Sequence, residues 1–327
     1  MKNKQSLLSI CIPTYNRKNI LEKCLKSFIN EAYYLNIPVI ISDNNSNDGT
    51  NILLKNISKK YSNIQYFIQN ENKGIDFNML FVADKCITKY GLWLGDDDLI
   101  IKNKLIEILN YLKTNNYDAI FLNYKYKNII QFDNLNEDLI LNSNQLYELF
   151  LKNNNLSLGI PYFGSIIFNR KQINIDYNSR YIGTNHLYFG SILDYIKDKK
   201  KILFTKDIFI LLDEFKIKKT WNNTLVKIYC NDILEFYNKI DNSYKLEKYK
   251  NNYIKNTFSI INIIYLKLYN TDKFDNIIYN KIAFKNFKNH TKYIGFLQKI
   301  NYILVCLLPL FILKILNICY QKTKKYL

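Results

Sequence analysis

The sequence predicts an α/β fold with a mainly parallel sheet covered by helices on both faces, followed by a basic helical region. Short runs that are almost wholly apolar alternate with segments of helical periodicity along the first 126 residues. Strands this apolar are typical of parallel sheets that are buried on both faces. Near residue 215 the strand patterns stop, and long Lys-rich helical segments follow. We therefore expect one domain at residues 1–215 and a separate Lys-rich helical region at 216–327.

Each expected element follows from its own pattern of apolar residues. Apolar runs predict strands in the first half of the domain, at residues 7–13, 38–42, 64–69, 92–95 and 118–124. Apolar residues spaced three and four apart predict helices between them, at residues 17–30, 49–61, 75–90 and 102–115. The second half mixes both patterns, with helices expected at 144–153 and 184–200 and strands at 161–169 and 202–214. The domain thus divides into residues 1–126 and residues 127–215.

Positive charge is concentrated in the last third of the chain. The net charge is +18, and residues 1–214 carry 26 Lys and Arg against 22 Asp and Glu, whereas residues 215–327 carry 20 against 6. Such asymmetry favours a polyanionic partner, either nucleic acid or an anionic membrane surface. A general bias toward Lys accounts for part of the excess, but not for the scarcity of acids. Because no nucleic-acid-binding module is recognisable, we expect no nucleic acid partner.

The most apolar stretch lies at residues 300–320. Its uninterrupted apolar run, Tyr302 to Leu313, is too short to span a bilayer, and Pro309 lies inside it. An in-plane helix, held by apolar insertion and by lysines against anionic headgroups, fits this pattern. A buried C-terminal helix is the alternative interpretation. We expect segment 300–320 to be membrane-associated.

Cysteine usage and the N-terminus predict a cytoplasmic protein. The six cysteines lie far apart, and no two form a Cys-x-x-Cys pair, which is typical of buried thiols in a reducing compartment. The apolar run near the N-terminus is too short for a signal peptide. Together with the tail, this predicts a peripheral protein on the inner face of the cytoplasmic membrane.

Polar residues follow four of the expected strands at the point where each strand ends. In a parallel sheet these carboxyl ends meet at one edge, where ligands bind. The residues are Pro13, Thr14, Tyr15 and Arg17 at the first strand, Asp43 at the second, Asn72, Gly74, Asp76 and Asn78 at the third, and Asp96, Asp97 and Asp98 at the fourth. We therefore expect one binding site along this edge.

The chemistry of these residues suits a nucleotide and a metal ion. Asp96, Asp97 and Asp98 are oxygen ligands of the kind that Mg²⁺ or Mn²⁺ prefers, and such ions also bind substrate phosphates. The alternative is that Asp97 or Asp98 caps the helix that follows. Asp43 could accept N–H bonds from a nucleobase. The sequence contains neither Gly-x-Gly-x-x-Gly nor a P-loop motif, so neither of those nucleotide folds is indicated.

Four blocks, "SICIPTYNRKNILEKCLKSF", "VIISDNNSNDGT", "NKGIDFNM" and "GLWLGDDD", together resemble family 2 glycosyltransferases of the GT-A (Rossmann-like) fold. The "WLGDDD" form resembles the abequosyltransferase-like branch of bacterial surface-polysaccharide enzymes. The resemblance covers about residues 6–215 and implies a nucleotide-sugar half at 1–126 and an acceptor half at 127–215. It also implies that the acidic turn is a DxD-type motif in which Gly95 replaces the first Asp. Asp96 would then contact the ribose or the metal, and Asp97 or Asp98 the metal.

The reaction implied by this resemblance is an inverting, metal-dependent glycosyl transfer. The donor would be a nucleoside-diphosphate sugar, and the acceptor a hydroxyl of a glycan or lipid-linked oligosaccharide in lipopolysaccharide or capsule biosynthesis. Asn185 and His186 stand where many members carry a Glu-Asp pair. His186 is the candidate base, with metal ligation or a structural role as alternatives.

Several other residues compete for roles in the second half. Asp194 is the first rival base, and Arg170 could shape the acceptor site. Three further candidates come later in the chain: Asp213 and Glu214 as bases and Trp221 at the acceptor site. Because the Glu-Asp pair is missing, a non-catalytic, membrane-associated nucleotide-sugar or carbohydrate-binding scaffold of the same fold is the alternative function.

Overall fold

The computed structural model describes residues 6–127, 129–133, 135–152, 162–196, 201–212 and 232–240, together with Ile300, Ile303, Leu304 and Ile312. The chain divides into two compact units, Met1–Ile217 and Lys218–Leu327. The second unit contributes helix α8 (Ile233–Lys239) to the described residues. Most of the expected apolar segment 300–320 lies outside them. Within the part of the chain that is described, no helix is long and apolar enough to cross a bilayer.

One sheet forms the centre of the first unit. Its main path runs β3 (Ile64–Ile68), β2 (Val39–Asp43), β1 (Leu8–Thr14), β4 (Tyr90–Trp93), β9 (Ile166–Asn169), β6 (Ala119–Tyr126), β10 (Ile202–Leu212) and β5 (Leu99–Ile100). Two short strands pair beside it, β7 (Ile129–Ile130) with β6 and β8 (Leu139–Leu141) with β10. The four neighbours β3, β2, β1 and β4 are parallel. Strand β9 then runs antiparallel to both β4 and β6.

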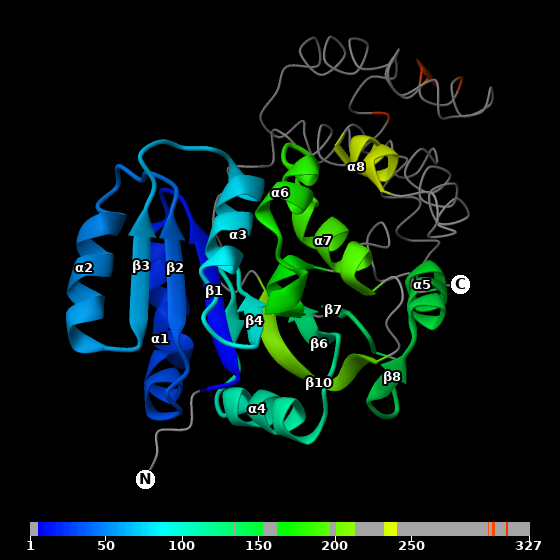
Figure 1. Ribbon diagram of the computed structural model, residues 1–327, viewed down its shortest axis with the longest axis horizontal. Coiled ribbons are helices and arrows are strands. Elements are labelled where there is room, and N and C mark those ends of the chain that lie inside the picture. Colours follow the sequence, from blue (N-terminus) through cyan, green and yellow to red (C-terminus); the bar gives the residue numbers. More distant parts are fainter. Residues whose placement is uncertain are drawn as a thin grey trace. The chain divides into compact units, whose positions relative to one another are not determined.

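Helices cover both faces of the sheet, as the sequence predicts (Figure 1). Alternate β1 residues such as Ile10 share one core with α1 (Lys18–Tyr34), α2 (Thr50–Lys60) and α4 (Lys104–Thr114). Helix α3 (Ile75–Asp84) contacts β1, β2 and β4, and there the indole N–H of Trp93 donates to the carbonyl of Met79. Helices α6 (Ile175–Asn178) and α7 (Leu187–Ile196) lie beside α3. The remaining short elements are α5 (Ser143–Lys152) and the 3-10 turns η2 (Phe163–Ser165), η3 (Arg170–Gln172) and η4 (Ser179–Tyr181).

The acidic turn after β4 does not cap a helix. Strand β5 intervenes, and α4 begins only at Lys104, with Asn103 at its N-cap. Three backbone N–H groups at this helix start donate to the carboxylate of Glu31, which comes from α1. The carboxylates of Asp97 and Asp98 are therefore not used as helix caps.

Arg170 lies at the opposite edge of the sheet from the expected site. Its backbone N–H donates to the carbonyl of Lys89, next to the start of β4, and its guanidinium pairs with Asp84 at 2.9 Å. The interpretation of Arg170 as an acceptor-site residue is therefore wrong. The other three late candidates lie outside the described residues, namely Asp213, Glu214 and Trp221.

Candidate active site

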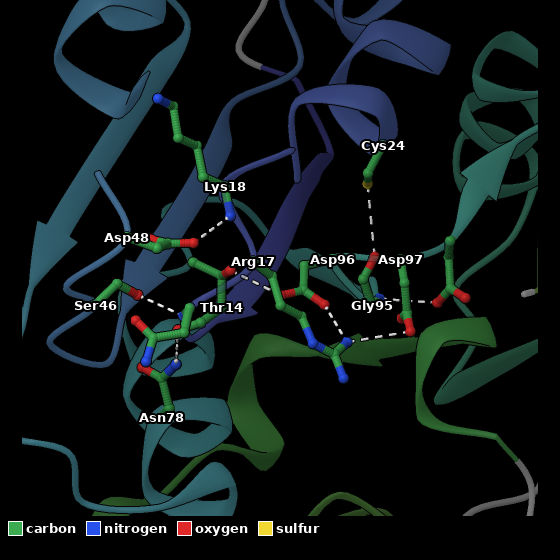
Figure 2. A network of polar contacts seen from close by, with 12 residues as sticks. Thr14, Arg17, Lys18, Cys24, Ser46, Asp48, Asn78, Gly95, Asp96 and Asp97 are labelled. Carbon is green, nitrogen blue, oxygen red and sulfur yellow. Dashed lines mark hydrogen bonds and ion pairs between the residues drawn. The ribbon is translucent and has the colours of Figure 1, made fainter. Parts of the chain in front are cut away.

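The carboxyl ends of β3, β2, β1 and β4 meet at one edge of the sheet, and the loops that follow them are tied together. The backbone N–H of Asn16 donates to the Ser46 hydroxyl at 2.7 Å, and that of Lys18 to Asp48 at 2.8 Å. These bonds join the loop after β1 to the loop after β2 (Figure 2). Pro13 is buried at the end of β1, whereas Tyr15 is exposed. Hydrogen bonds thus connect the loops at this edge, where one aromatic side chain is open to solvent.

Asp96 is buried between two side chains from the first loop. The Thr14 hydroxyl donates to one of its oxygens at 2.7 Å, and Arg17 Nη1 donates to the other at 2.8 Å. Burial raises the pKa of Asp96 to about 6, although the Arg17 guanidinium acts in the opposite direction. Asp96 therefore orders the junction between β1 and β4.

Asp97 is the most accessible carboxylate of the acidic turn. Its side chain is 24% exposed, compared with 7% for Asp96. The same Arg17 Nη1 that contacts Asp96 donates to Asp97 at 3.1 Å. Figure 2 shows Arg17 lying between these two carboxylates. Asp97 is thus the member of the turn that an incoming ligand can reach.

Asp98 is turned into the protein. One of its oxygens accepts the Gly95 N–H at 3.0 Å and the Tyr162 hydroxyl at 2.8 Å. A Cβ added at Gly95 or at Gly164 would lie 2.4 Å from that oxygen, so the carboxylate fits only against glycine. Burial, followed by the nearby Asp97 charge, raises the pKa of Asp98 well above its ordinary value. Asp98 therefore fastens the acidic turn to the second half of the domain.

Asp43 presents a buried acceptor at the tip of β2. Its Oδ1 accepts the backbone N–H of Ser46 at 3.1 Å and also the hydroxyl of that residue. Its Oδ2 is buried and has no hydrogen-bond partner among the described residues. Burial raises the pKa of Asp43, against the opposing effect of the Ser46 bonds. A buried acceptor left open costs free energy, so this oxygen is suited to a ligand N–H.

The polar residues after β3 hold the neighbouring loops in place. The Asn72 carbonyl oxygen accepts from the Asn44 amide at 2.8 Å and from the Gly74 N–H at 2.9 Å. Gly74 has a φ of 84°, which favours glycine. The Asn78 amide donates to backbone carbonyls at the ends of β1 and β2 and accepts from a Ser42 hydroxyl. These side chains position the edge from within.

Asp76 joins α3 to the start of α7. Its carboxylate accepts the backbone N–H groups of Gly183 at 2.9 Å, Asn185 at 2.8 Å and Leu187 at 3.4 Å. Asn185 and Leu187 flank His186 in the sequence, and His186 is buried. Asp76 thus fixes the turn that carries the candidate base beside the first turn of α3.

Asp194 lies two helical turns beyond His186, on α7. Arg180 Nη2 contacts both of its oxygens at 2.7 Å, and the Tyr181 hydroxyl donates to one of them at 2.9 Å. An ion pair of this kind stabilises the carboxylate and weakens it as a base. The surroundings of Asp194 therefore suit a structural ion pair better than proton abstraction.

A divalent metal ion fits the donor set of this edge only in part. Within the described ranges, no three His, Cys, Asp or Glu side chains gather as a metal site. Mg²⁺, however, is commonly held by one or two carboxylates together with substrate phosphates and water. Asp97, with Asp96 beside it, supplies that kind of incomplete oxygen set. These residues fit the metal provided that a diphosphate completes the coordination.

The sequence missed Tyr162 and Gly164 as site residues. Both come from the second half of the domain and reach the acidic turn through Asp98. Neither residue belongs to a motif, and neither follows one of the four parallel strands. No sequence signal distinguishes Tyr162 from the other 27 tyrosines of the chain.

Four parallel strands that end in one polar edge, with an acidic turn after β4, define a GT-A type α/β fold. The chain belongs to glycosyl transferase family 2, whose profile matches residues 9–175. The family and fold predicted from the four sequence blocks are thereby confirmed.

Two curated relatives match parts of this chain. Abequosyltransferase RfbV of Salmonella typhimurium is 32% identical over a region covering 55% of this chain and 58% of that protein. The GalNAc(5)-diNAcBac-PP-undecaprenol beta-1,3-glucosyltransferase of Campylobacter jejuni is 33% identical over 31% of this chain and 33% of that protein. The matched regions thus span about three-fifths and one-third of these relatives.

Solved structures of low sequence identity share the fold. S. aureus TarS 1-349 in complex with UDP-GlcNAc superposes with a TM-score of 0.57 at 14% identity, covering 91% of this chain and 90% of that one. The mannosyltransferase PcManGT from Pyrobaculum calidifontis, in complex with GDP-Man and Mn²⁺, gives a TM-score of 0.55 at 10% identity, covering 93% and 86%. At this identity the comparison speaks for the fold alone.

Proposed function

We propose that this chain transfers a sugar from a nucleoside-diphosphate sugar to a hydroxyl of a glycan or lipid-linked oligosaccharide. The carrying observation is that Asp43 offers a buried open acceptor at the tip of β2, while Asp97 is accessible at the tip of β4. These strands flank β1, so the two tips are about 10 Å apart at ordinary strand spacing. A nucleoside with its diphosphate extends over a comparable distance. Among the relatives, the name abequosyltransferase supports a role for this chain in assembling a bacterial surface polysaccharide.

In this proposal the donor lies across the tips of β2, β1 and β4. The nucleobase donates an N–H to Asp43, and the exposed ring of Tyr15 lies beside the base and ribose. The diphosphate reaches Arg17 and Asp97 at the acidic turn. Mg²⁺ or Mn²⁺ held by Asp97, with Asp96 beside it, would neutralise charge on the departing diphosphate. Asp98 acts through its hold on the turn.

Inversion follows from attack by the acceptor hydroxyl in line with the departing diphosphate. The acceptor needs a group that removes its proton, and we assign this role to His186 because histidine is the side chain that most often acts as a general base. Asp76 holds the turn around His186 through three backbone N–H groups. Asp194 is the weaker candidate because Arg180 pairs with both of its oxygens.

Replacing His186 with Ala should lower kcat about 100-fold or more, the usual effect of losing a general base. The donor affinity should stay within about twofold, because His186 comes from the second half of the domain. Donor binding by calorimetry and product formation by mass spectrometry would check both values. Asp194→Asn is the matched comparison. It should lower the melting temperature while changing kcat less than His186→Ala does. An unchanged kcat in His186→Ala would remove this residue as the base.

A donor panel tests the function itself. UDP-, dTDP-, GDP- and CDP-sugars would each be tested for binding and, with Mg²⁺ or Mn²⁺, for release of the nucleoside diphosphate. We expect one nucleotide class to bind and to be turned over. Binding of a nucleotide sugar without release or transfer, under all acceptor conditions, would favour the non-catalytic scaffold instead.

We also propose that the enzyme is peripheral on the inner face of the cytoplasmic membrane, where a lipid-linked acceptor would lie. The support is the sequence of the basic region, with 20 Lys and Arg against 6 acids, and its apolar segment at 300–320. Deleting residues 300–327 should reduce co-sedimentation with vesicles that contain anionic lipid and leave donor binding intact. Equal sedimentation of both forms would contradict this location.

A further inference from the structure

Arg17 already places a positive charge at the carboxylates that the metal would use. Its Nη1 donates to Asp96 at 2.8 Å and to Asp97 at 3.1 Å, so one nitrogen bridges the two residues. Burial lowers the pKa of Arg17, but the Asp96 and Asp97 carboxylates outweigh this effect and raise it. Figure 2 shows the guanidinium between the two carboxylates. The acidic turn is thus partly neutralised by the protein itself.

The remaining N–H groups of Arg17 are available to another anion. A guanidinium carries five donors in a planar fork, and Nη1 is the nitrogen that contacts the carboxylates. The Nε and Nη2 groups have no hydrogen-bond partner among the described residues. The side chain is 22% exposed. Arg17 can therefore turn from the carboxylates toward a phosphate group without leaving the edge of the sheet.

A divalent ion and the guanidinium are unfavourable neighbours at these two carboxylates. In a partly buried setting their repulsion is screened less than in water. A diphosphate removes this conflict because it supplies negative charge to both cations and extra oxygens to the metal. Metal binding and diphosphate binding should then depend on each other, and such coupling is reciprocal.

We infer that Arg17 is the resident counter-cation of the acidic turn and makes divalent-metal binding depend on the donor diphosphate. Without diphosphate, Arg17 holds Asp96 and Asp97, and the metal binds weakly. With diphosphate, the free donors of Arg17 contact it, and the metal gains access to Asp97. This inference rests on the metal-dependent transfer proposed above and adds the order in which the site fills.

The test measures Mn²⁺ binding directly, by electron paramagnetic resonance of the free ion, with Mn²⁺ alone and with UDP, dTDP, GDP or CDP present. In the unmodified chain the nucleotide that binds should tighten Mn²⁺ binding by about 100-fold, or about 2.7 kcal/mol at 1.36 kcal/mol per tenfold. In Arg17→Gln, Mn²⁺ alone should bind about tenfold tighter than in the unmodified chain, and the tightening by nucleotide should fall to about tenfold. Lys26→Gln, which removes one positive charge from α1, the helix that Arg17 precedes, should match the unmodified chain.

Arg17→Lys is the second variant, and it retains the charge if Arg17→Gln does not fold. A single ammonium cannot bridge two carboxylates and also offer a fork to the diphosphate, so its Mn²⁺ affinity should lie between the other two. Equal or weaker binding of Mn²⁺ alone in both Arg17 variants would overturn the inference while leaving metal dependence intact. If the unmodified chain binds no Mn²⁺ with any of the four nucleotides, the metal dependence in the proposed function fails as well.

Discussion

Replacing Asp97 with Asn should lower kcat about a thousandfold while thermal stability stays within a few degrees. Asp97 is the accessible carboxylate of the turn, and its described contact is the 3.1 Å bond from Arg17. In the proposed complex, losing the charge would remove an interaction with the metal that becomes stronger as the diphosphate departs, which is where electrostatic stabilisation has its largest effect. Initial rates at saturating donor, together with thermal unfolding, would separate the two properties.

Asp98→Asn is the matched variant, since it changes the neighbouring carboxylate in the same way. Its buried oxygen accepts from both Gly95 and Tyr162, and an amide oxygen in the same place can accept both bonds. Because burial raises the pKa of Asp98, as it does that of Asp43, the uncharged Asn should keep or raise the stability at pH 7, and turnover should fall far less than in Asp97→Asn. If Asp97→Asn keeps its turnover while Asp98→Asn loses it without unfolding, the roles of the two residues are reversed.

Much of the fold could be predicted from the sequence because local patterns dictate it. The strand ending at Asp43 is a short apolar run in the sequence and is fully buried as β2 in the structure. Parallel pairing then brings the loops after β3, β2, β1 and β4 to one edge without any knowledge of side-chain contacts. The location of the site therefore follows from topology alone.

The separate roles of the three aspartates could not be predicted in this way. They are identical and adjacent in the sequence, and distant partners distinguish them. The Thr14 hydroxyl holds Asp96 from 82 positions away, and the Tyr162 hydroxyl holds Asp98 from 64 positions away. Asp97 remains accessible because its two neighbours are held. Such partners become visible only when the chain is folded.

The contacts of Asp76 and Asn78 could not be predicted from the sequence either. Both follow the third strand, so the sequence presents them as contacts for the nucleotide sugar. In the structure the Asp76 carboxylate accepts from the turn before α7, and the Asn78 amide bridges the ends of β1 and β2. Their contacts support a positioning role at the same edge. The sequence could indicate where they lie but not what they touch.

Replacing Asp43 with Asn should weaken donor binding and stabilise the free protein at the same time. The open Oδ2 of Asp43 accepts a base N–H in the proposed complex, whereas an amide nitrogen there would face that donor with another donor. A mismatch of about 1–3 kcal/mol corresponds to a roughly 5- to 150-fold loss of affinity. Burial raises the pKa of Asp43, so its charged form opposes folding, and the uncharged Asn removes that penalty.

The pH dependence separates these effects. Because its folded pKa is raised, Asp43 contributes most to stability below its unfolded pKa of about 3.9, and this contribution is lost as the pH rises through the folded value. The stability gained in Asp43→Asn should therefore be present at pH 7 and vanish near pH 4. Denaturant unfolding at both pH values and calorimetric titration with the donor would measure the two outcomes.

Asp48, in the loop that follows β2, provides a control in which the effect on stability has the opposite sign. Burial raises the pKa of Asp48, but hydrogen bonds from Lys18 and Thr50 outweigh it and lower the pKa. Asp48→Asn should thus lose stability at pH 7, and the loss should shrink as the pH falls through the depressed pKa of this group. A loss of stability in Asp43→Asn at pH 7 with unchanged donor affinity would make Asp43 a structural carboxylate. The combination expected here, weaker binding with greater stability, is what a buried acceptor reserved for a ligand should produce.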